Sequence, residues 1–285
     1  MRASRAEIIS YIFNKIHTLY SESECKLIAR MVAASLSNEA ESKYLIEPNE
    51  IIEIEGVEKC AEELAAGRPV QYVIGRAEFC GEELFVRKGV LIPRPETEEL
   101  VMWAMECAES FARPNILDVC TGSGCIAIAL KKRLHNASVT AIDLSDKALE
   151  IATENTQRLN ADVRIIKDDA LKGLPSVQGQ TFDIIVSNPP YIPQSEMAAM
   201  HINVTEHEPH MALFVDDNDP LIFYREIARA AKKLLSEQGY LLFEIHETLA
   251  TETADMLSHE GFHNVEIRHD FRQKPRMICC QPNLK

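Results

Sequence analysis

The segment Asn188–Pro189–Pro190–Tyr191 places an amide side chain, two prolines and an aromatic ring in four consecutive residues. The prolines fix two φ angles and push the backbone of Asn188 into an extended conformation. The Asn188 side-chain oxygen and the Pro189 main-chain oxygen can each accept one N–H, and the Tyr191 ring offers a flat apolar face. The segment is therefore suited to clamping a planar –NH2 group, although a plain proline turn after a strand would have the same sequence.

A second candidate site, Cys120–Thr121–Gly122–Ser123–Gly124, lies between an expected strand at 115–119 and an expected helix at 125–134. With Ala127 it matches the pattern G-x-G-x-x-A in the context that a nucleotide-binding turn requires. Glycine permits positive φ and a close approach of ligand to backbone. The N-terminus of the following helix offers unpaired N–H groups. We expect a cofactor at this loop.

Acidic residues follow the next two expected strands. Asp143 comes at the end of a strand at 139–142, where a carboxylate can accept hydrogens from both hydroxyls of a ribose. Asp168–Asp169–Ala170 follows a strand at 163–167, where an acid can hold an adenine amino group, the alternative being a solvated pair of charges. The glycine loop and Asp143 fit NAD and S-adenosylmethionine equally well.

The Asn188–Tyr191 segment favours S-adenosylmethionine, because nothing in the chain resembles a hydride-transfer site. The nitrogen of an amide or aromatic amine is a poor nucleophile, since its lone pair is delocalised. Two acceptors on its hydrogens raise the electron density on nitrogen and aim it along the methyl–sulfur axis, so that orientation lowers the barrier. The sulfonium is an activated leaving group, and we expect no metal. No general base is evident, and the proton could leave to water.

The elements that position these residues alternate between strand and helix from residue 114 onward. This pattern predicts a mainly parallel sheet covered by helices on both faces. The expected strands are 115–119, 139–142, 163–167, 182–187, 240–244, 265–268 and 277–280. The expected helices are 96–110, 125–134, 145–159, 221–235 and 247–260, with Ser145 and Asp219 as N-caps and Pro220 in the first turn.

The N-terminal residues 4–67 have the pattern of a small all-helical unit. Ser4 with Glu7 and Ser21 with Glu24 have the form of capping boxes, each followed by apolar residues at helical spacing. Between this unit and the catalytic part, segments 78–86 and 89–92 could pair as a hairpin that turns at 87–89.

The composition is that of an ordinary globular protein, with 285 residues, 46% hydrophobic and 26% charged. No apolar run approaches the ~20 residues that span a bilayer, and the first twenty residues lack the features of a signal peptide. The eight cysteines form no C-x-x-C pair, which favours buried thiols in a reducing compartment. We therefore expect a cytoplasmic protein without a membrane partner. The formal net charge of −14 disfavours a nucleic acid partner.

Several motifs together resemble the peptide chain release factor glutamine methyltransferases of the HemK/PrmC type. Asn-Pro-Pro-Tyr also occurs in DNA adenine methyltransferases, so this motif alone does not indicate which substrate is methylated. The motifs that carry the resemblance are Gln71–Gly75, Glu78–Phe79, Leu91–Glu98, Cys120–Gly124, Ser187–Ile192 and Glu208–Leu213. They cover most of the chain.

The resemblance implies an α/β fold: a Rossmann-like, seven-stranded class I methyltransferase domain at 98–285, joined by a hairpin or extended linker at 71–97 to a helical substrate-recognition domain at 1–70. By motif position, the residues expected to bind S-adenosylmethionine are Cys120, Thr121, Gly122, Ser123, Gly124, Asp143, Asp169, Ala170 and Asn188. Those expected to hold the substrate are Asn188, Pro189, Pro190 and Tyr191. Cys120 replaces a glycine common in the family and should have an ordinary β-region φ.

The implied activity is methylation of the side-chain amide nitrogen of the glutamine in the Gly-Gly-Gln motif of release factors, by a monomer. The alternatives are a glutamine methyltransferase acting on a ribosomal protein, a nucleic-acid adenine N6-methyltransferase, and a non-catalytic binding module. Histidines at 201, 207 and 210 lie in the long segment after Tyr191, which we expect to grip the substrate. Arg94 could pair with the cofactor carboxylate or with Glu98.

Overall fold

The computed structural model describes residues 1–283, and the chain folds into two compact units. One comprises residues 1–76 with residues 200–208; the other comprises residues 77–199 and the chain from residue 209 onward. Residues 200–208 thus belong with the N-terminal unit although they lie within the segment that follows Tyr191. The domain boundaries expected at 70 and 97 stay a prediction. No helix among the described residues is long and apolar enough to cross a membrane.

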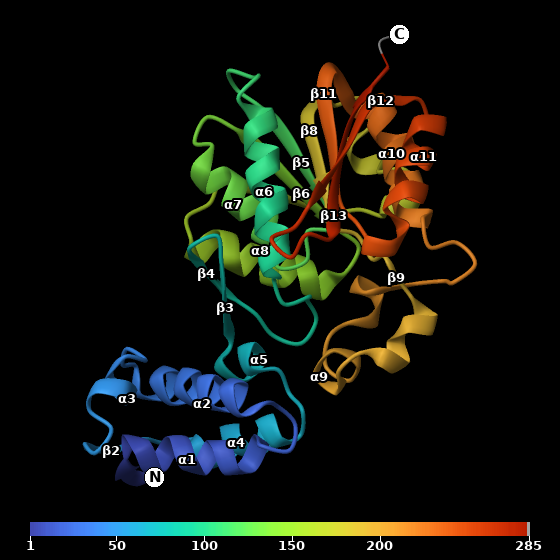
Figure 1. Ribbon diagram of the computed structural model, residues 1–285. Helices are drawn as coiled ribbons and strands as arrows, with labels where there is room; N and C mark the ends of the chain where they lie inside the picture. Colours follow the sequence, from blue (N-terminus) through green and yellow to red (C-terminus); the bar gives the residue numbers. More distant parts are fainter. Residues whose placement is uncertain (284–285) are drawn as a thin grey trace. The chain divides into compact units, whose positions relative to one another are not determined.

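The N-terminal unit is built mainly from short helices around one apolar core (Figure 1). Its helices are α1 (Arg5–Ile16), α2 (Glu22–Ser37), α3 (Lys43–Ile46), α4 (Val57–Ala65), α5 (Val70–Ile74) and, from the later segment, α9 (Ile202–Thr205). Both expected capping boxes are present, because Ser4 and Ser21 each accept the backbone N–H three residues on while the glutamate there bonds back. Each box satisfies donors that the first helical turn leaves unpaired.

The unit is not all-helical as expected, because two three-residue strands, β1 (Arg2–Ser4) and β2 (Ile51–Glu53), pair antiparallel. Strands this short carry no readable alternation in sequence. Beside them, the buried Arg5 forms ion pairs with Glu39, Glu47 and Glu50. One cation thus binds carboxylates from two loops of the unit, the one after α2 and the one after α3.

The second unit, residues 77–199 with the chain from residue 209 onward, contains the expected cofactor and substrate residues and is called the catalytic unit for that reason. It contains a seven-stranded mixed sheet in the order β12-β13-β11-β8-β5-β6-β7. Its strands are β5 (Asn115–Val119), β6 (Ser138–Asp143), β7 (Val163–Lys167), β8 (Phe182–Ser187), β11 (Leu235–Glu244), β12 (Phe262–His269) and β13 (Pro275–Pro282). The five strands from β11 to β7 in that order are parallel, and β13 pairs antiparallel with both β11 and β12. The expected strands and the mainly parallel sheet are confirmed.

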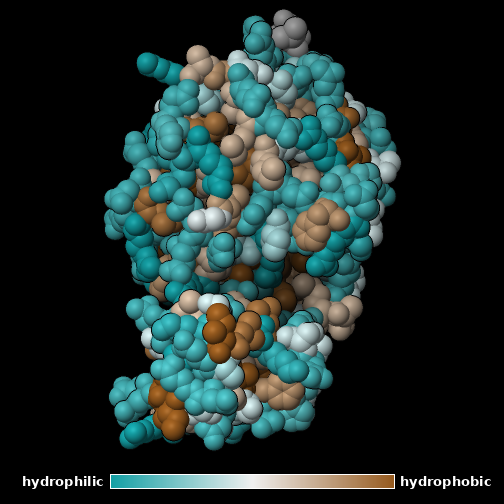
Figure 2. All heavy atoms as spheres, turned by 60° about the vertical axis from the view of Figure 1, so that its left-hand side comes forward, coloured by the Kyte–Doolittle hydropathy of each residue, from teal (hydrophilic) through white to brown (hydrophobic). Residues whose placement is uncertain are grey.

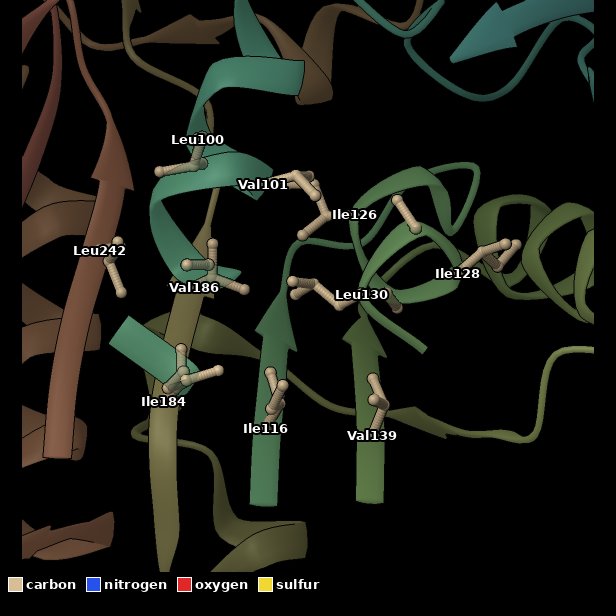
Figure 3. Packing of buried hydrophobic residues seen from close by; sticks show 14 of the residues in the cluster. Leu100, Val101, Ile116, Ile126, Ile128, Leu130, Val139, Ile184, Val186 and Leu242 are labelled. Carbon is tan, nitrogen blue, oxygen red and sulfur yellow. The ribbon is translucent and has the colours of Figure 1, made fainter. Parts of the chain in front are cut away.

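Helices cover both faces of this sheet (Figure 1). On one face lie α6 (Pro95–Ala108), α7 (Cys125–Arg133) and α8 (Asp146–Arg158), and on the other α10 (Ile222–Leu234) and α11 (Ala250–His259). Each face has its own apolar cluster, and the neighbouring residues Cys279 and Cys280 of β13 belong to different clusters. In Figure 3, Leu100 and Val101 of α6 lie above Val186 and Ile184 of β8. This packing holds the start of α6 over the ends of the central strands.

Short elements complete the unit. Two strand pairs lie outside the main sheet: β3 (Arg76–Phe79) with β4 (Glu82–Phe85), and β9 (Ile192–Pro193) parallel to β10 (Phe214–Val215). Single 3-10 turns are found at Ala170–Lys172, Pro175–Val177, Gln194–Ala199, His210–Ala212 and Glu247–Leu249. The segment after Tyr191 therefore has more local structure than the sequence indicated.

The hairpin at the start of the catalytic unit turns at Cys80–Gly81, not at 87–89 as expected. Cys80 and Gly81 have φ angles of 53° and 76°, and two positive φ values are what a tight two-residue hairpin turn requires. The apolar character of 78–86 concealed the turn, because cysteine before glycine is not a usual turn signal. Residues 88–90 instead form a turn and a bend, and Gly89, Val90 and Leu91 line the pocket described below.

Two helix starts also differ from the expectation. Helix α10 begins at Ile222, with Leu221 as its N-cap and no side-chain hydrogen bond from that residue. The carboxylate of Asp219, the predicted N-cap, accepts from the guanidinium of Arg225 at 2.7 and 2.9 Å and also from the backbone N–H of Leu221. The helix expected from residue 247 begins with a 3-10 turn and becomes α-helical only at Ala250.

Candidate cofactor and substrate site

A pocket with about 1000 Å³ of empty space, including its open mouth, lies at the carboxyl ends of the parallel strands of the catalytic unit. This is where open α/β sheets bind ligands, because the strand order reverses between the first strand and its neighbours. The residues predicted to bind cofactor or substrate that lie in its wall are Cys120, Thr121, Gly122, Ser123, Asp143, Asp169, Ala170, Asn188 and Pro190. Gly124, Pro189 and Tyr191 are not part of the wall.

The glycine loop between β5 and α7 is held in a left-handed conformation at three of its positions. Cys120, Gly122 and Gly124 have φ angles of 64°, 57° and 83°. The expectation of an ordinary β-region φ at Cys120 was therefore wrong: the loop keeps the backbone shape that glycine favours although the side chain is present, at a cost of about 1 kcal/mol. At Gly124 an added Cβ would lie 3.2 Å from Ile128 and 3.3 Å from Ala152, so this glycine also permits close packing.

Asp143 at the end of β6 holds the loop from the opposite side. Its carboxylate accepts the backbone N–H of Gly122 and that of Ser145, both at 2.9 Å. Each oxygen keeps a further lone pair for a ligand hydroxyl. Burial raises the pKa of this carboxyl group, while the backbone hydrogen bonds oppose the rise.

Asp118 supports the loop from beneath, inside β5. One of its oxygens accepts the hydroxyl of Thr121 at 2.6 Å and the backbone N–H of Ala127 at 3.2 Å. The other oxygen is buried without a hydrogen-bond partner, as is the Ser123 hydroxyl. Burial raises the pKa of Asp118 to about 7.

The two aspartates after β7, Asp168 and Asp169, make different hydrogen bonds. Asp168 accepts the backbone N–H and, in a short contact, the hydroxyl of Ser176, so it fixes the following turn. Asp169 accepts the backbone N–H of Leu171 at 3.0 Å and lies 3.3 Å from Lys172. Both aspartates and the buried Ala170 line the pocket.

The Asn188–Tyr191 segment starts where β8 ends, beside the glycine loop. Ser187 donates its hydroxyl to the main-chain oxygen of Val119 at 2.6 Å, which ties the end of β8 to β5. The side-chain nitrogen of Asn188 donates to the Thr97 hydroxyl at 3.2 Å, and the Tyr191 hydroxyl donates to Glu244 at 3.0 Å. Asn188 therefore faces the same pocket as the cofactor loop.

Sequence reasoning missed three residues that organise the site: Thr97, Asn155 and Glu244. All three are buried polar residues, with exposed fractions of 2%, 0% and 2%. Asn155 of α8 bonds the N–H and the oxygen of Phe85 at 2.7 and 3.0 Å, and the oxygen of Ser123 at 2.9 Å. A polar residue interrupting the apolar face of an expected helix was the signal that could have revealed it.

The remaining wall comes from two segments that flank the site. Gly89, Val90, Leu91, Pro93, Arg94 and Thr97 form one part, and Pro209, Met211 and Ala212 form another. Arg94 thus lies at the pocket, whereas the carboxylate of Glu98 accepts the backbone N–H of Cys80 at 2.8 Å.

The residues present fit S-adenosylmethionine. The Asp143 carboxylate can accept hydrogen bonds from the hydroxyls of a ribose. The apolar side chains of Val90, Leu91 and Ile142 in the pocket wall suit the base of a nucleoside. The hydroxyl of Ser123 lies in the wall, is buried without a hydrogen-bond partner among the described residues, and offers an acceptor for a positive group of the cofactor.

The sheet order, the glycine loop and Asp143 define the protein as a class I S-adenosylmethionine-dependent methyltransferase. The family called methyltransferase small domain matches residues 99–208. Two solved structures share the fold: the hMettl16 catalytic domain in complex with an RNA hairpin (TM-score 0.58, 15% identity, covering 78% of this chain and 81% of that one), and a methyltransferase from Pyrococcus furiosus (TM-score 0.50, 18% identity, covering 70% and 89%).

Curated relatives narrow the class. The release factor glutamine methyltransferase of Bacteroides thetaiotaomicron is 37% identical over 274 residues, covering 95% of this chain and 98% of that protein. That of Flavobacterium psychrophilum is 46% identical over 219 residues, covering 76% of each. The chain belongs to the release factor glutamine methyltransferase family.

Proposed function

We propose that this enzyme methylates the side-chain amide nitrogen of the glutamine in the Gly-Gly-Gln motif of peptide chain release factors. The observation that carries the proposal is that Asn188 lies in the wall of the same pocket as the glycine loop and Asp143. The residue proposed to orient the amide therefore faces the cavity proposed to hold the methyl donor, and Pro190 lines the same cavity. The names of the relatives support a release factor as the methyl acceptor.

S-Adenosylmethionine supplies an activated methyl group on a sulfonium. The chain supplies two acceptors, the side-chain oxygen of Asn188 and the main-chain oxygen of Pro189, which would bind the two amide hydrogens and raise the electron density on nitrogen. The prolines keep the two acceptors at a fixed spacing, and Tyr191 would pack against the flat amide. With the nitrogen held in line with the methyl–sulfur bond, orientation lowers the barrier to transfer.

The N-terminal unit would grip the protein substrate. Leu45, Ile46 and Ile51 of this unit are exposed by 65%, 75% and 65%. Figure 2 shows small apolar patches on a mostly hydrophilic surface. Scattered exposed apolar residues are common, but these three fall within seven positions of the chain. We expect the enzyme to act as a monomer in the cytoplasm, on protein and not on nucleic acid.

The direct test is transfer of labelled methyl from S-adenosylmethionine to purified release factor, beside a release factor whose motif glutamine is replaced by alanine. Label on the unaltered factor alone is the expected result. Label on neither protein, with cofactor still bound, would overturn the proposal and direct the search to ribosomal proteins and then to DNA.

A further inference from the structure

Glu244 is a buried carboxylate linked by hydrogen bonds to both ends of the Asn188–Tyr191 segment, to Tyr191 directly and to Asn188 through Thr97. One of its oxygens accepts the Thr97 hydroxyl at 2.6 Å, and the other accepts the Tyr191 hydroxyl at 3.0 Å. Glu244 ends β11, which lies beside β8 in the sheet, and α6, which carries Thr97, packs against both strands. The contact is therefore built from three elements of the catalytic unit.

The direction of these hydrogen bonds determines how Asn188 is oriented. An ionised carboxylate only accepts, so the single hydroxyl hydrogen of Thr97 is committed to Glu244. Thr97 can then only accept from Asn188, which must turn its –NH2 group toward Thr97, as the 3.2 Å contact has it. The side-chain oxygen of Asn188 is left to point away from Thr97.

We propose that Thr97 and Glu244 are positioning residues that fix the polarity of the Asn188 amide, so that the site presents two acceptors and selects glutamine over glutamate. This inference rests on the proposed function. A glutamine side chain offers two hydrogens to two acceptors, whereas a glutamate carboxylate offers none and would be repelled by both oxygens. The reversed Asn188 would present its –NH2 group and remove that discrimination.

Protonation of Glu244 would reverse the chain of hydrogen bonds. The acid proton could be donated to Thr97, whose hydroxyl would then donate to Asn188 and draw the amide oxygen toward itself. Burial raises the pKa of Glu244 above its ordinary value. The groups that face it are Thr97 and Glu96 from α6, the hydroxyl of Tyr191, and Arg276 from β13, while Tyr224 of α10 donates to its main-chain oxygen. The rate of methyl transfer should therefore decrease as the pH is lowered and Glu244 takes up a proton.

The first measurement compares steady-state kinetics of Thr97→Val, Thr97→Ser and the unaltered enzyme on release factor. Valine keeps the shape of threonine and removes the hydroxyl, so we expect kcat to fall by about 10- to 100-fold, because loss of orientation can cost this much, with cofactor affinity changed less than about threefold. Serine keeps the hydroxyl and should restore most of the rate. Thr253→Val is the matched control, since Thr253 is a fully buried threonine of α11 whose hydroxyl binds only the main-chain oxygen of Leu249.

The second measurement is the pH profile of kcat/KM. The unaltered enzyme should show an acid limb, and both Thr97→Val and Glu244→Gln should lose it, because the first cuts the link to Asn188 and the second removes the titrating group. Glu244 is not part of the pocket wall, so its variant separates orientation of Asn188 from contact with the cofactor. Melting temperatures and cofactor titration show that each variant is folded.

The third measurement is inhibition by a release factor whose motif glutamine is replaced by glutamate. This glutamate variant should compete poorly with release factor for the unaltered enzyme. Thr97→Val should reduce the ratio of affinities for glutamine over glutamate by about tenfold, the order expected for the net free energy of one hydrogen bond. Unaltered enzyme that labels the motif glutamine, together with Thr97→Val that keeps its rate, acid limb and discrimination, would overturn this inference alone. No transfer by the unaltered enzyme would overturn the proposed function and this inference with it.

Discussion

Cys120 is a non-glycine residue in the left-handed region, at the turn where β5 leaves the sheet. Its side chain packs against the apolar cluster on the α10 face of the sheet, and burial raises the pKa of its thiol. The packing of the thiol offsets part of the backbone strain. The two effects can be separated, because alanine and glycine both remove the thiol but only glycine relaxes the backbone.

We expect Cys120→Gly to be more stable than Cys120→Ala by about 1 kcal/mol, since glycine adopts positive φ without a Cβ clash. The check is urea unfolding of both variants. The control is the same pair at Cys107, within α6, where glycine should instead be less stable than alanine by about 1 kcal/mol. Equal stability of the Cys120 pair would show that strain at this position is negligible.

The pKa of Asp118, raised by burial to about 7, predicts a pH dependence of stability. Between its ordinary value and about 7 the folded chain binds more protons at Asp118 than the unfolded chain does. The free energy of unfolding should therefore decrease as pH rises through this window, and stay level above it. At about 1.4 kcal/mol per pKa unit, the decrease is on the order of 4 kcal/mol in the absence of cofactor.

Asp118→Asn should flatten this dependence, because asparagine can still accept from Thr121 and Ala127 but does not titrate. The measurement is urea unfolding between about pH 5 and about pH 8. The curves for the two proteins should diverge as pH rises, with the variant the more stable at the upper end. Parallel curves would mean that Asp118 is ionised throughout the range.

At the scale of elements, Asn155 joins three pieces of the catalytic unit: the hairpin strand β4, the helix α8 and the cofactor loop. Its amide pairs with both backbone groups of Phe85 as a neighbouring strand would, and also binds the oxygen of Ser123. Arg87, just beyond β4, adds ion pairs to Glu150 and Glu154 of the same helix. The cofactor loop is thereby held by an element outside the sheet.

Asn155→Ala should lower the free energy of unfolding by about 2–4 kcal/mol, because the partly buried N–H and oxygen of Phe85 and the buried oxygen of Ser123 all lose their partner. It should also weaken cofactor binding, since Ser123 lines the pocket. Calorimetric titration with S-adenosylmethionine checks the second effect. Thr156→Ala, one residue along α8, removes a buried hydroxyl bonded only within the helix and should leave cofactor affinity unchanged. Unchanged affinity in Asn155→Ala would show that the loop holds its shape without this contact.

At the scale of the whole molecule, the chain passes between its two units three times, because residues 200–208 pack with the N-terminal unit. There the ring of His201 stacks on Tyr20 at 5.5 Å, and its Nε2 lies 3.3 Å from the oxygen of Leu19. Tyr191 and Met211, which lie before and after this segment in the chain, belong to the catalytic unit. The expected substrate-gripping role of this segment stays a prediction.

Leu45→Glu combined with Ile46→Glu should raise KM for release factor by about tenfold or more, because an apolar contact would be replaced by two charges. Cofactor affinity should not change, since the substitutions lie on exposed positions of the N-terminal unit. The matched control is Met102→Glu, at a residue of α6 in the catalytic unit that is 61% exposed. An unchanged KM for the double variant would place the substrate grip elsewhere.

The sequence by itself determined the parallel core of the sheet, the glycine loop, Asp143 and the position of Asn188. These depend on local patterns: apolar runs of strand length, glycines after a strand, and prolines that fix their own φ angles. The capping boxes of the N-terminal helices were predictable for the same reason, since their hydrogen bonds join residues three apart.

The tertiary structure decided what depends on residues far apart in the chain. The links from Asn188 to Thr97 and from Thr97 to Glu244 span 91 and 147 positions, and no local pattern marks Thr97 or Glu244 as members of one chain of hydrogen bonds. The positive φ of Cys120 and the turn at Cys80 also follow from surrounding contacts, because they go against local preference. Only packing supplies the free energy that holds a residue in a conformation its own sequence disfavours.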